Sequence, residues 1–312
     1  MIEYDYGRKT ALYEWNETVQ KMLDWIEKNI GENPTLLKMS EQVGYSPYYC
    51  SVKFHKTCGM TIKRYISGRR LALAALELRD TNERIIDIAM KYGFSSQEAL
   101  TRAFAAAFGC APAAYRRNPT PVPLPIRKVV FFPEHYNKLY KGGIKMNDIT
   151  EARVRTEFIP AHRYIGIWDS VAEDYCGFWE RHSCDEICGT IDSMSNVSDI
   201  IITCHTAGWT LNGDKRCYFY GLGVPHDYDG AVPDGFEIRD IPAAYYLVFY
   251  HPPYDYLKDN GEVMGRVESL AWNYDIKDFG GGKYVWDESA PCYQRHYPEG
   301  IGYEILRPIK LK

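Results

Sequence analysis

The sequence lacks several features that mark specialised protein classes. No stretch approaches the 18 or more consecutive apolar residues of a membrane span, so no membrane association is expected. The first residues, MIEYDYGRKT, are polar and do not contain the apolar segment of a secretion signal. The nine cysteines form no even framework, which favours reduced thiols and a cytoplasmic protein.

Metal-ligand and nucleophile motifs are also scarce. His182, Cys184 and Cys188 cluster in RHSCDEICG, but a zinc site needs about four ligands, usually in paired motifs. No Ser-His-Asp arrangement or other nucleophile motif occurs. We therefore expect ordinary buried or surface thiols, with no metal and no cofactor.

The composition fits a folded chain of two domains. The 312 residues are 46% hydrophobic and 25% charged. The formal net charge of −4 lacks the basic excess that is usual in nucleic-acid-binding proteins. That average hides an asymmetry, because residues 44–118 carry 12 Lys and Arg against 5 Asp and Glu, whereas residues 121–312 carry 20 against 28. The two halves are thus built for different partners.

The basic region contains an internal repeat of about 50 residues. LLKMSEQVGYSPYYCSVKFHKTCGMTIKRYI (36–66) matches RIIDIAMKYGFSSQEALTRAFAAAFGCAPAAYR (84–116). In each copy a glycine, Gly44 or Gly93, precedes an aromatic residue and a serine. A left-handed glycine ends one helix and turns the chain sharply. The repeat therefore predicts two helix-turn-helix units.

The same spacings predict caps, a connecting helix and the core. We expect Ser46 and Ser95 to cap the second helix of each copy. A long central helix is expected over about 61–79, which is rich in strong helix formers. Apolar residues at i, i+4 spacing should face the core, namely Cys50, Phe54, Leu100 and Phe104.

With these motifs, residues 19–117 resemble the DNA-binding domain of the AraC/XylS family of transcription regulators. The strongest match is IIDIAMKYGFSSQEALTRAF followed by FG-x-x-P-x-x-YR. The resemblance implies that two recognition helices enter successive major-groove segments of double-stranded DNA. It also implies base reading from the outward-facing positions, which here are Tyr48, Ser51, Val52, His55, Gln97, Glu98, Thr101 and Arg102.

The chemistry of these side chains differs between the two helices. Arg102 suits guanine and Gln97 suits adenine, because both make bidentate hydrogen bonds to base edges. Ser51 and Val52 stand where longer polar side chains often occur, which favours apolar contact with thymine methyl groups in the first helix. The alternative for each single residue is a phosphate contact or solvated surface.

A proline-rich segment follows the repeat. Prolines at alternate positions in NPTPVPLP (118–125) predict extended chain. We therefore expect a DNA-binding domain at 1–118, a Pro-rich linker and connecting segment at 119–150, and a second domain at 151–312. Residues 126–133 are either a short strand or a hydrophobic strap.

The C-terminal half mixes strand-like and helix-like runs, an α+β pattern. Helices are predicted over 169–183 and 256–272. Ile-Pro-Ala recurs at 159–161 and 241–243, with a tyrosine three residues after each alanine. The expected fold class is an all-α double helix-turn-helix domain plus an α+β domain of two pseudo-symmetric strand–helix–strand halves. The strand-like runs are ARVRTEFIP, RYIGIW, IIITCHTA, RCYFYGLGV, AYYLVFY and GYEILRPI.

On the Ile-Pro-Ala strands and the final GYEILRPI, residues 153–312 resemble the GyrI-like effector-binding domain. The resemblance implies an aromatic-walled cavity in which a glutamate of the last strand meets lipophilic cations, and Glu304 is the matching residue. Ring faces and a buried carboxylate both attract an organic cation. Structural pairing of Glu304 with a nearby Arg or Lys is the alternative. The candidate wall residues are Trp168, Trp179, Tyr218, Tyr220, Tyr246 and Trp272.

The leading interpretation is a transcription regulator that responds to a small lipophilic or cationic effector, with RNA polymerase as a further candidate partner. One alternative is a GyrI-like hydrolase with Glu304 and a tyrosine as general acid and base. Another is a non-sensing, partner-binding appendage on the DNA-binding domain. Without a nucleophile motif, no enzymatic activity is expected.

Overall fold

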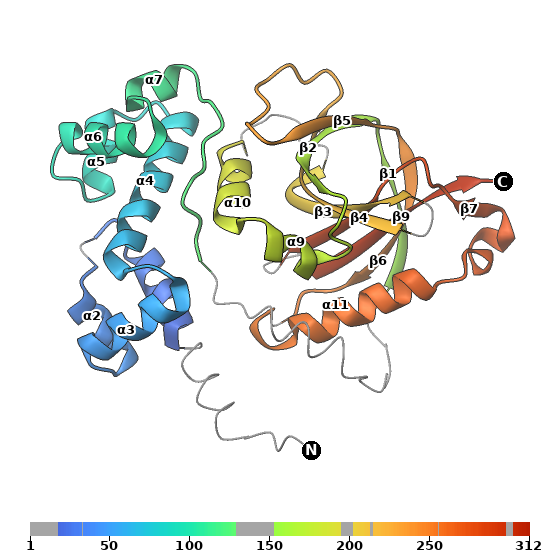
Figure 1. Cartoon of the computed structure of the whole chain (residues 1–312), viewed down its shortest axis with the longest axis horizontal. Helices are drawn as coiled ribbons and strands as arrows, with labels where there is room; N and C mark the ends of the chain where they lie inside the picture. The colour runs from blue at the N-terminus through green and yellow to red at the C-terminus, as the bar shows by residue number, and fades with distance from the viewer. Residues whose placement is uncertain are drawn as a thin grey trace. The chain divides into compact units, whose positions relative to one another are not determined.

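The computed structural model describes residues 18–32, 34–128, 153–194, 202–212, 215–254, 256–297 and 302–312. The chain divides into two compact units, both drawn in Figure 1. The first comprises Met1–Phe131 with Cys188–Ser193, and the second comprises Phe132–Ile187 with Met194–Lys312. Within the described parts of the chain, no helix is both long and apolar enough to cross a membrane.

Helices build the first unit, as the repeat predicts. The pairs α2–α3 and α5–α6 form the two helix-turn-helix units, and α4 lies between them in the chain. Residues 18–28 form a helix that is followed by α2 (Leu36–Val43), α3 (Pro47–Cys58), α4 (Ile62–Asp80), α5 (Ile85–Lys91), α6 (Gln97–Phe108) and α7 (Pro112–Arg117).

Local sequence sets the turn and the cap in each pair. Gly44 has a φ of 76° and Gly93 a φ of 70°, in the left-handed region that glycine enters freely. Ser46 caps α3 by accepting a hydrogen bond from a backbone N–H three residues on, which confirms that prediction. In the second copy Ser96, not Ser95, makes this bond. The prediction of Ser95 is wrong because the extra residue of this copy moves the helix start by one position.

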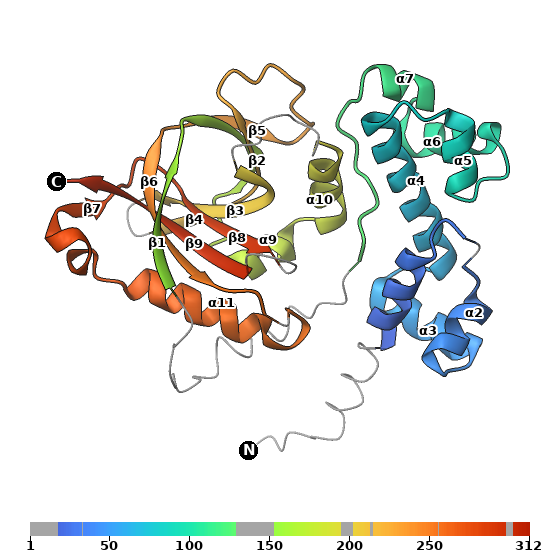
Figure 2. The same ribbon diagram turned by 180° about the vertical axis from the view of Figure 1, so that it is seen from behind.

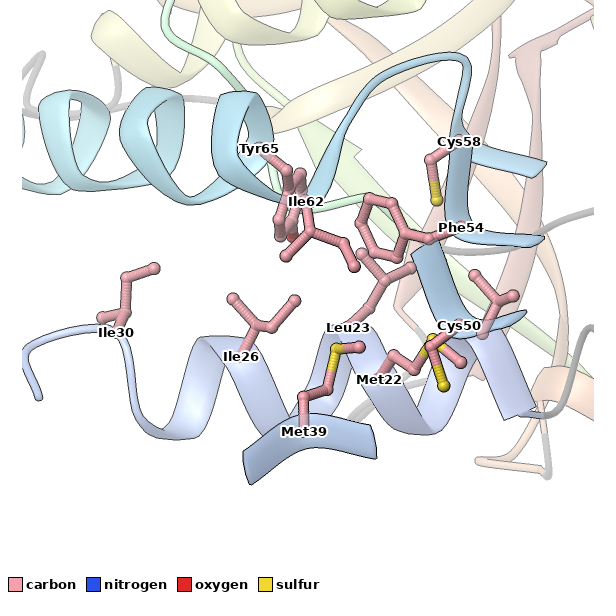
Figure 3. Close-up of a cluster of buried hydrophobic side chains, with 11 residues drawn as sticks. Met22, Leu23, Ile26, Ile30, Met39, Cys50, Phe54, Cys58, Ile62 and Tyr65 are labelled. Carbon is pink, nitrogen blue, oxygen red and sulfur yellow. The ribbon is translucent and has the colours of Figure 1, made fainter. Parts of the chain in front are cut away.

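The first helix-turn-helix packs against the helix that precedes it. Figure 3 shows the apolar cluster, in which the predicted core residues Cys50 and Phe54 are fully buried. Leu100 and Phe104 are equally buried in the core of the second copy. Burying a side chain of this size stabilises the fold by about 1.5–3 kcal/mol. The recognition helices are thus fixed by their inward faces.

Arg70 of α4 links the end of the first helix to the second copy of the repeat. Its guanidinium donates to the carbonyl oxygens of Ile30 at 3.0 Å, Glu32 at 2.6 Å and Gly93 at 3.4 Å. Gly93 has no side chain there, and an added Cβ would lie 2.7 Å from the guanidinium carbon. Because one side chain contacts the end of the first helix and the turn of the second copy, α4 fixes the spacing between the two pairs.

The proline-rich segment packs on the first unit. Residues 119–128 form neither helix nor strand, and Val122 and Leu124 are buried in the core of the second helix-turn-helix. Residues 126–133 were expected to form either a short strand or a hydrophobic strap. Residues 126–128 form no strand, and residues 129–133 lie outside the described residues. The boundaries drawn at residues 118 and 150 stay predictions.

The second unit is built on one antiparallel sheet. The strand order is β1-β6-β9-β8-β3-β4-β2-β5, and β7 pairs with β9. The α+β class is confirmed, and of these strands β5, β7 and β8 were not predicted from the sequence. The strands are β1 (Arg153–Ile159), β2 (His162–Asp169), β3 (Ile202–Asn212), β4 (Lys215–Pro225), β5 (Glu237–Ile241), β6 (Ala244–His251), β7 (Tyr284–Trp286), β8 (Cys292–Tyr297) and β9 (Gly302–Leu311).

The strand order is symmetric about the β8–β3 pair. Strands β2, β4 and β3 on one side correspond to β6, β9 and β8 on the other. The first strand of each half pairs with the other half, since β1 lies beside β6 and β5 beside β2. The two Ile-Pro-Ala segments connect β1 to β2 and β5 to β6. The repeat predicts the two halves, but the exchange of first strands appears only in the structure.

The helices of this unit differ in part from expectation. They are α9 (Tyr175–Arg181) and α11 (Tyr256–Asn273), which packs against β6 and β9 (Figure 2). A further helix, α10 (Cys184–Ser193), begins in this unit, and its residues Cys188–Ser193 belong to the first unit. The helix predicted over 169–183 is wrong in its first part. Asp169 ends β2, and its carboxylate accepts backbone hydrogen bonds from Val171 and Ala172, which forms a turn instead.

Candidate functional site

The outward face of α3 is largely apolar. Tyr48 is 79% exposed and Val52 is 44% exposed. His55 is exposed one turn further on, and Ser51 is half-buried. Lys53 lies 5.4 Å from the ring centroid of Tyr49, on the same helix. The four predicted positions of α3 therefore lie on one helix, where Tyr48, Val52 and His55 are exposed.

The outward face of α6 is charged. Glu98 and Arg102 are exposed one helical turn apart, whereas Gln97 and Thr101 are half-buried. A hydrogen bond from the Ser96 hydroxyl lowers the pKa of Glu98, so this carboxylate is ionised at neutral pH. The Thr101 hydroxyl donates to the carbonyl oxygen of Gln97 at 2.9 Å. Glu98 and Arg102 are therefore the accessible polar side chains of the predicted set on α6.

Glu304 is the buried member of an ionic network on the sheet. It is 1% exposed on β9 and lies directly opposite Arg295 of β8. Arg155 of β1 donates to one carboxylate oxygen at 2.7 Å, and Arg295 lies 2.9 Å from the other. Both arginines also contact Glu157. Glu304 is thus ion-paired, which was the structural alternative, and its contact with a ligand stays a prediction.

The charges of this network balance. Two arginines face two glutamates, so no net charge is left at the site. Although partial burial opposes its ionisation, hydrogen bonds from Arg295 and Arg155 lower the pKa of Glu157. Each arginine contacts both glutamates, so removing one member leaves each of its neighbours with a single partner of opposite charge. The four side chains therefore act as one electrostatic unit.

A cluster of rings lies on the same side of the sheet as Glu304. Tyr164 contacts Phe219 at 4.9 Å and Trp168 at 5.5 Å between ring centroids. Tyr293 lies 6.1 Å from Tyr164 and 5.8 Å from Tyr246. Tyr164 and Tyr246 are the two tyrosines of the Ile-Pro-Ala repeat. Both repeats therefore deliver a ring to one buried cluster.

One hydroxyl in this cluster differs from its neighbours. Tyr164 donates to the carbonyl oxygen of Thr206, and the Tyr293 hydroxyl lies 3.0 Å from the His162 ring. The hydroxyl of Tyr246 is fully buried and finds no hydrogen-bond partner among the described residues. Buried polar groups are rarely left without a partner. The hydrogen-bonding capacity of this hydroxyl is therefore unused within the described residues.

The remaining predicted wall residues lie on the opposite side of the sheet. Neighbouring residues of a strand point to opposite faces, so Tyr218 and Tyr220 face away from Phe219. Tyr220 contacts Trp179 of α9 at 4.8 Å. Trp272 of α11 contacts Trp209, which also contacts Tyr218. The structure therefore brings together Glu304, Trp168 and Tyr246, and separates them from Trp179, Tyr218, Tyr220 and Trp272.

The sequence did not predict the site residues Arg155, Glu157, Tyr293 and Arg295. Tyr293 and Arg295 lie on β8, and the signal for that strand was the short run CYQRHY between two prolines. Arg155 lies on β1, which was predicted, but its pairing across the sheet depends on the exchange of first strands. Pairing of that kind joins residues far apart in the sequence, so no local pattern reports it.

The cysteine cluster takes no part in either site. His182 ends α9, and its Nε2 lies 2.9 Å from the carboxylate of Asp169. Arg181 donates to the same carboxylate at 2.6 Å, and these contacts help to keep the pKa of Asp169 low despite its burial. Across the described segments, no group of three or more His, Cys, Asp or Glu side chains could hold a metal ion.

Comparison with known proteins covers the first unit best. A helix-turn-helix domain family model matches residues 39–118. The Transposon Tn10 TetD protein of Escherichia coli is 41% identical over 100 residues, which are 32% of this chain and 72% of that protein. The HTH-type transcriptional activator AarP of Providencia stuartii is 36% identical over 119 residues, which are 38% of this chain and 87% of that protein.

Among solved structures, SAV2435 bound to tetraphenylphosphonium is similar over 51% of this chain and 94% of its own length. Its sequence is 15% identical to this one, and the TM-score is 0.37. A likeness at that level assigns no ligand to this chain.

Proposed function

Because the chain belongs to the AraC family of DNA-binding transcription regulators, we propose that α3 and α6 read one asymmetric DNA site while the second unit binds a small effector. The observation that supports the DNA part is the accessible outward face of both helices, at the same positions in two copies of one unit. Two recognition helices in one chain suffice for an asymmetric site, so neither a palindrome nor a dimer is required.

The DNA part is tested by selecting sites for the full-length protein from random DNA. We expect an asymmetric site, bound by one chain, with protection of two successive major-groove segments on one face of the duplex. A selected site that is palindromic and bound only by a dimer argues against the proposal, as does equal affinity for selected and random DNA. Transcription with purified RNA polymerase then tests whether binding has a regulatory effect.

The effector site that we propose is the side of the sheet that carries Glu304, Trp168 and Tyr246, which we call the inner face. Its support is the coexistence of stacked rings, a buried ionic network and the unpartnered Tyr246 hydroxyl on one face. A buried hydroxyl without a partner costs free energy, and an acceptor on a ligand would remove that cost. Rings provide apolar contact and attract cations through their faces.

Titration of the full-length protein with tetraphenylphosphonium, a lipophilic cation, tests this site. Triphenylphosphine oxide is the matched neutral probe, and its oxygen can accept a hydrogen bond from Tyr246. We expect Glu304→Gln to weaken the cation more than the neutral probe, and Tyr246→Phe to weaken the neutral probe. Equal affinities in wild type and both variants argue against the inner face as the effector site.

A further inference from the structure

Helices α3 and α6 correspond residue by residue. Each has twelve residues, begins after a serine cap and ends at a left-handed glycine. The caps are Ser46 and Ser96, and the glycines have φ values of 71° and 73°. An offset of 50 residues therefore relates every position of one helix to a position of the other.

The buried residues confirm this correspondence. Cys50 matches Leu100 and Phe54 matches Phe104, and all four side chains are fully buried. With the same face turned inward, the two helices present the same positions outward. Val52 of α3 consequently occupies the position of Arg102 in α6, and Tyr48 occupies the position of Glu98.

The two outward pairs have opposite chemistry. Glu98 and Arg102 can both hydrogen-bond to base edges, since arginine donates to guanine and glutamate accepts from cytosine. Val52 has no hydrogen-bonding group in its side chain, yet 44% of it is exposed. The 5-methyl group of thymine is the apolar feature that base edges offer in the major groove. An exposed valine at a reading position matches that group and no other.

We propose that Val52 makes this regulator recognise thymine methyl groups under α3, while Arg102 and Glu98 recognise a G·C pair under α6. This inference rests on the proposed DNA-binding function and specifies its substrate. The operator is then asymmetric in composition, with an A·T pair facing Val52 and a G·C pair facing Arg102. The large exposed ring of Tyr48, one turn before Val52, extends the apolar contact.

The basic residues of the two helices support the same division. Lys53 and Lys56 of α3 correspond to Ala103 and Ala106 of α6. Lysines near a reading position can neutralise phosphates without choosing a sequence. Helix α3 therefore combines apolar reading with phosphate anchoring, whereas α6 depends on hydrogen bonds to bases.

The test measures binding of the full-length protein to its selected operator, in which each thymine in turn is replaced by deoxyuridine. This change removes one methyl group and keeps every hydrogen-bonding atom of the base. We expect about a fourfold loss of affinity at the thymine that faces α3, since one buried methyl group has about that effect. In Val52→Ala, the same replacement should have a clearly smaller effect, because the shorter side chain loses most of its contact with the methyl group.

Two matched variants identify the helix responsible. Arg102→Ala should keep the full thymine-to-deoxyuridine difference, because α6 does not contact that methyl group. Leu37→Ala, which truncates an exposed apolar side chain outside the recognition helices, should also keep it. A Val52→Ala protein that shows the full wild-type loss at the thymine facing α3 overturns the inference. Specific DNA binding without any such difference overturns it too, whereas loss of all specific binding overturns the proposed function itself.

Discussion

Arg155 donates to the Glu304 carboxylate at 2.7 Å, and the two side chains differ sharply in accessibility, with 39% and 1% exposed respectively. The arginine therefore occupies the accessible side of a buried carboxylate, where a cationic group of a ligand would also bind. A cation that binds the Glu304 carboxylate therefore competes with Arg155 and Arg295, and Arg155 is the more exposed of these two competitors.

Replacing Arg155 by glutamine should therefore strengthen the binding of a lipophilic cation. We expect the affinity for tetraphenylphosphonium to rise about tenfold. The cation then no longer has to replace the hydrogen bond from Arg155 to Glu304, and a hydrogen bond to a charged group contributes about 1.5–3 kcal/mol. Calorimetric titration measures this directly. Arg163→Gln is the matched control, since Arg163 is similarly exposed and pairs with Asp240 instead. Weaker binding in the Arg155 variant would show that the guanidinium helps to hold the ligand.

Removing the Tyr246 hydroxyl should not destabilise the ligand-free protein. The hydroxyl is buried without a partner, so Tyr246→Phe is expected to be neutral or to raise the free energy of unfolding by about 1 kcal/mol. Tyr218→Phe is the contrast, because Tyr218 donates to Gln294 at 2.7 Å and should lose about 1 kcal/mol. Urea unfolding followed by tryptophan fluorescence compares them. A clear loss in Tyr246→Phe would reveal a partner for that hydroxyl.

Arg102→Ala should lower specific DNA affinity much more than nonspecific affinity. A bidentate arginine–guanine contact contributes about 1–3 kcal/mol of discrimination, so about a tenfold to hundredfold loss is expected at the selected operator. Arg84→Ala serves as control, because Arg84 is an exposed arginine of the same unit that pairs with Asp87 outside α6. Equal losses on operator and random DNA would identify Arg102 as a phosphate contact.

The cap of α6 can be located by two adjacent substitutions. Ser96→Ala should lower the stability of the first unit by about 1 kcal/mol, because Ser96 accepts a hydrogen bond from the first turn of α6. Ser95→Ala should change the stability of the first unit by only a few tenths of a kcal/mol, roughly as for other surface substitutions. Thermal unfolding of both variants compares their stabilities. A larger loss in Ser95→Ala than in Ser96→Ala would identify Ser95 as the cap.

Stability of the second unit should fall in mild acid because of His296. Burial lowers the pKa of His296 from 6.5 to about 4. Between these values the unfolded chain binds more protons than the folded one, so acid favours unfolding. The contribution is complete above pH 6.5 and decreases by about 2–3 kcal/mol as the pH falls to 4.5. Urea unfolding at pH 7 and pH 4.5 should show a smaller difference in His296→Gln; an unchanged difference would assign the acid sensitivity to other groups.

Most of the first unit could be predicted because its signals are local. The two glycines, the Ser46 cap and the apolar residues at i, i+4 spacing each act within a few residues of the chain. The one error, Ser95 in place of Ser96, arose where two serines stand together and a single inserted residue decides which of them begins the helix. A repeat pattern aligns the two copies but does not say on which side of Ser95 the extra residue falls.

The sequence by itself determined the two classes of domain, the duplicated recognition helices and the two related halves of the sheet. Only the tertiary structure decided which rings share a face and which cation Glu304 meets. Strand register assigns Trp168 and Tyr246 to one side and Tyr218 and Tyr220 to the other. The exchange of first strands brings Arg155 to Glu304 across 149 positions of the chain. Such contacts follow from strand pairing between distant segments, for which no local sequence pattern exists.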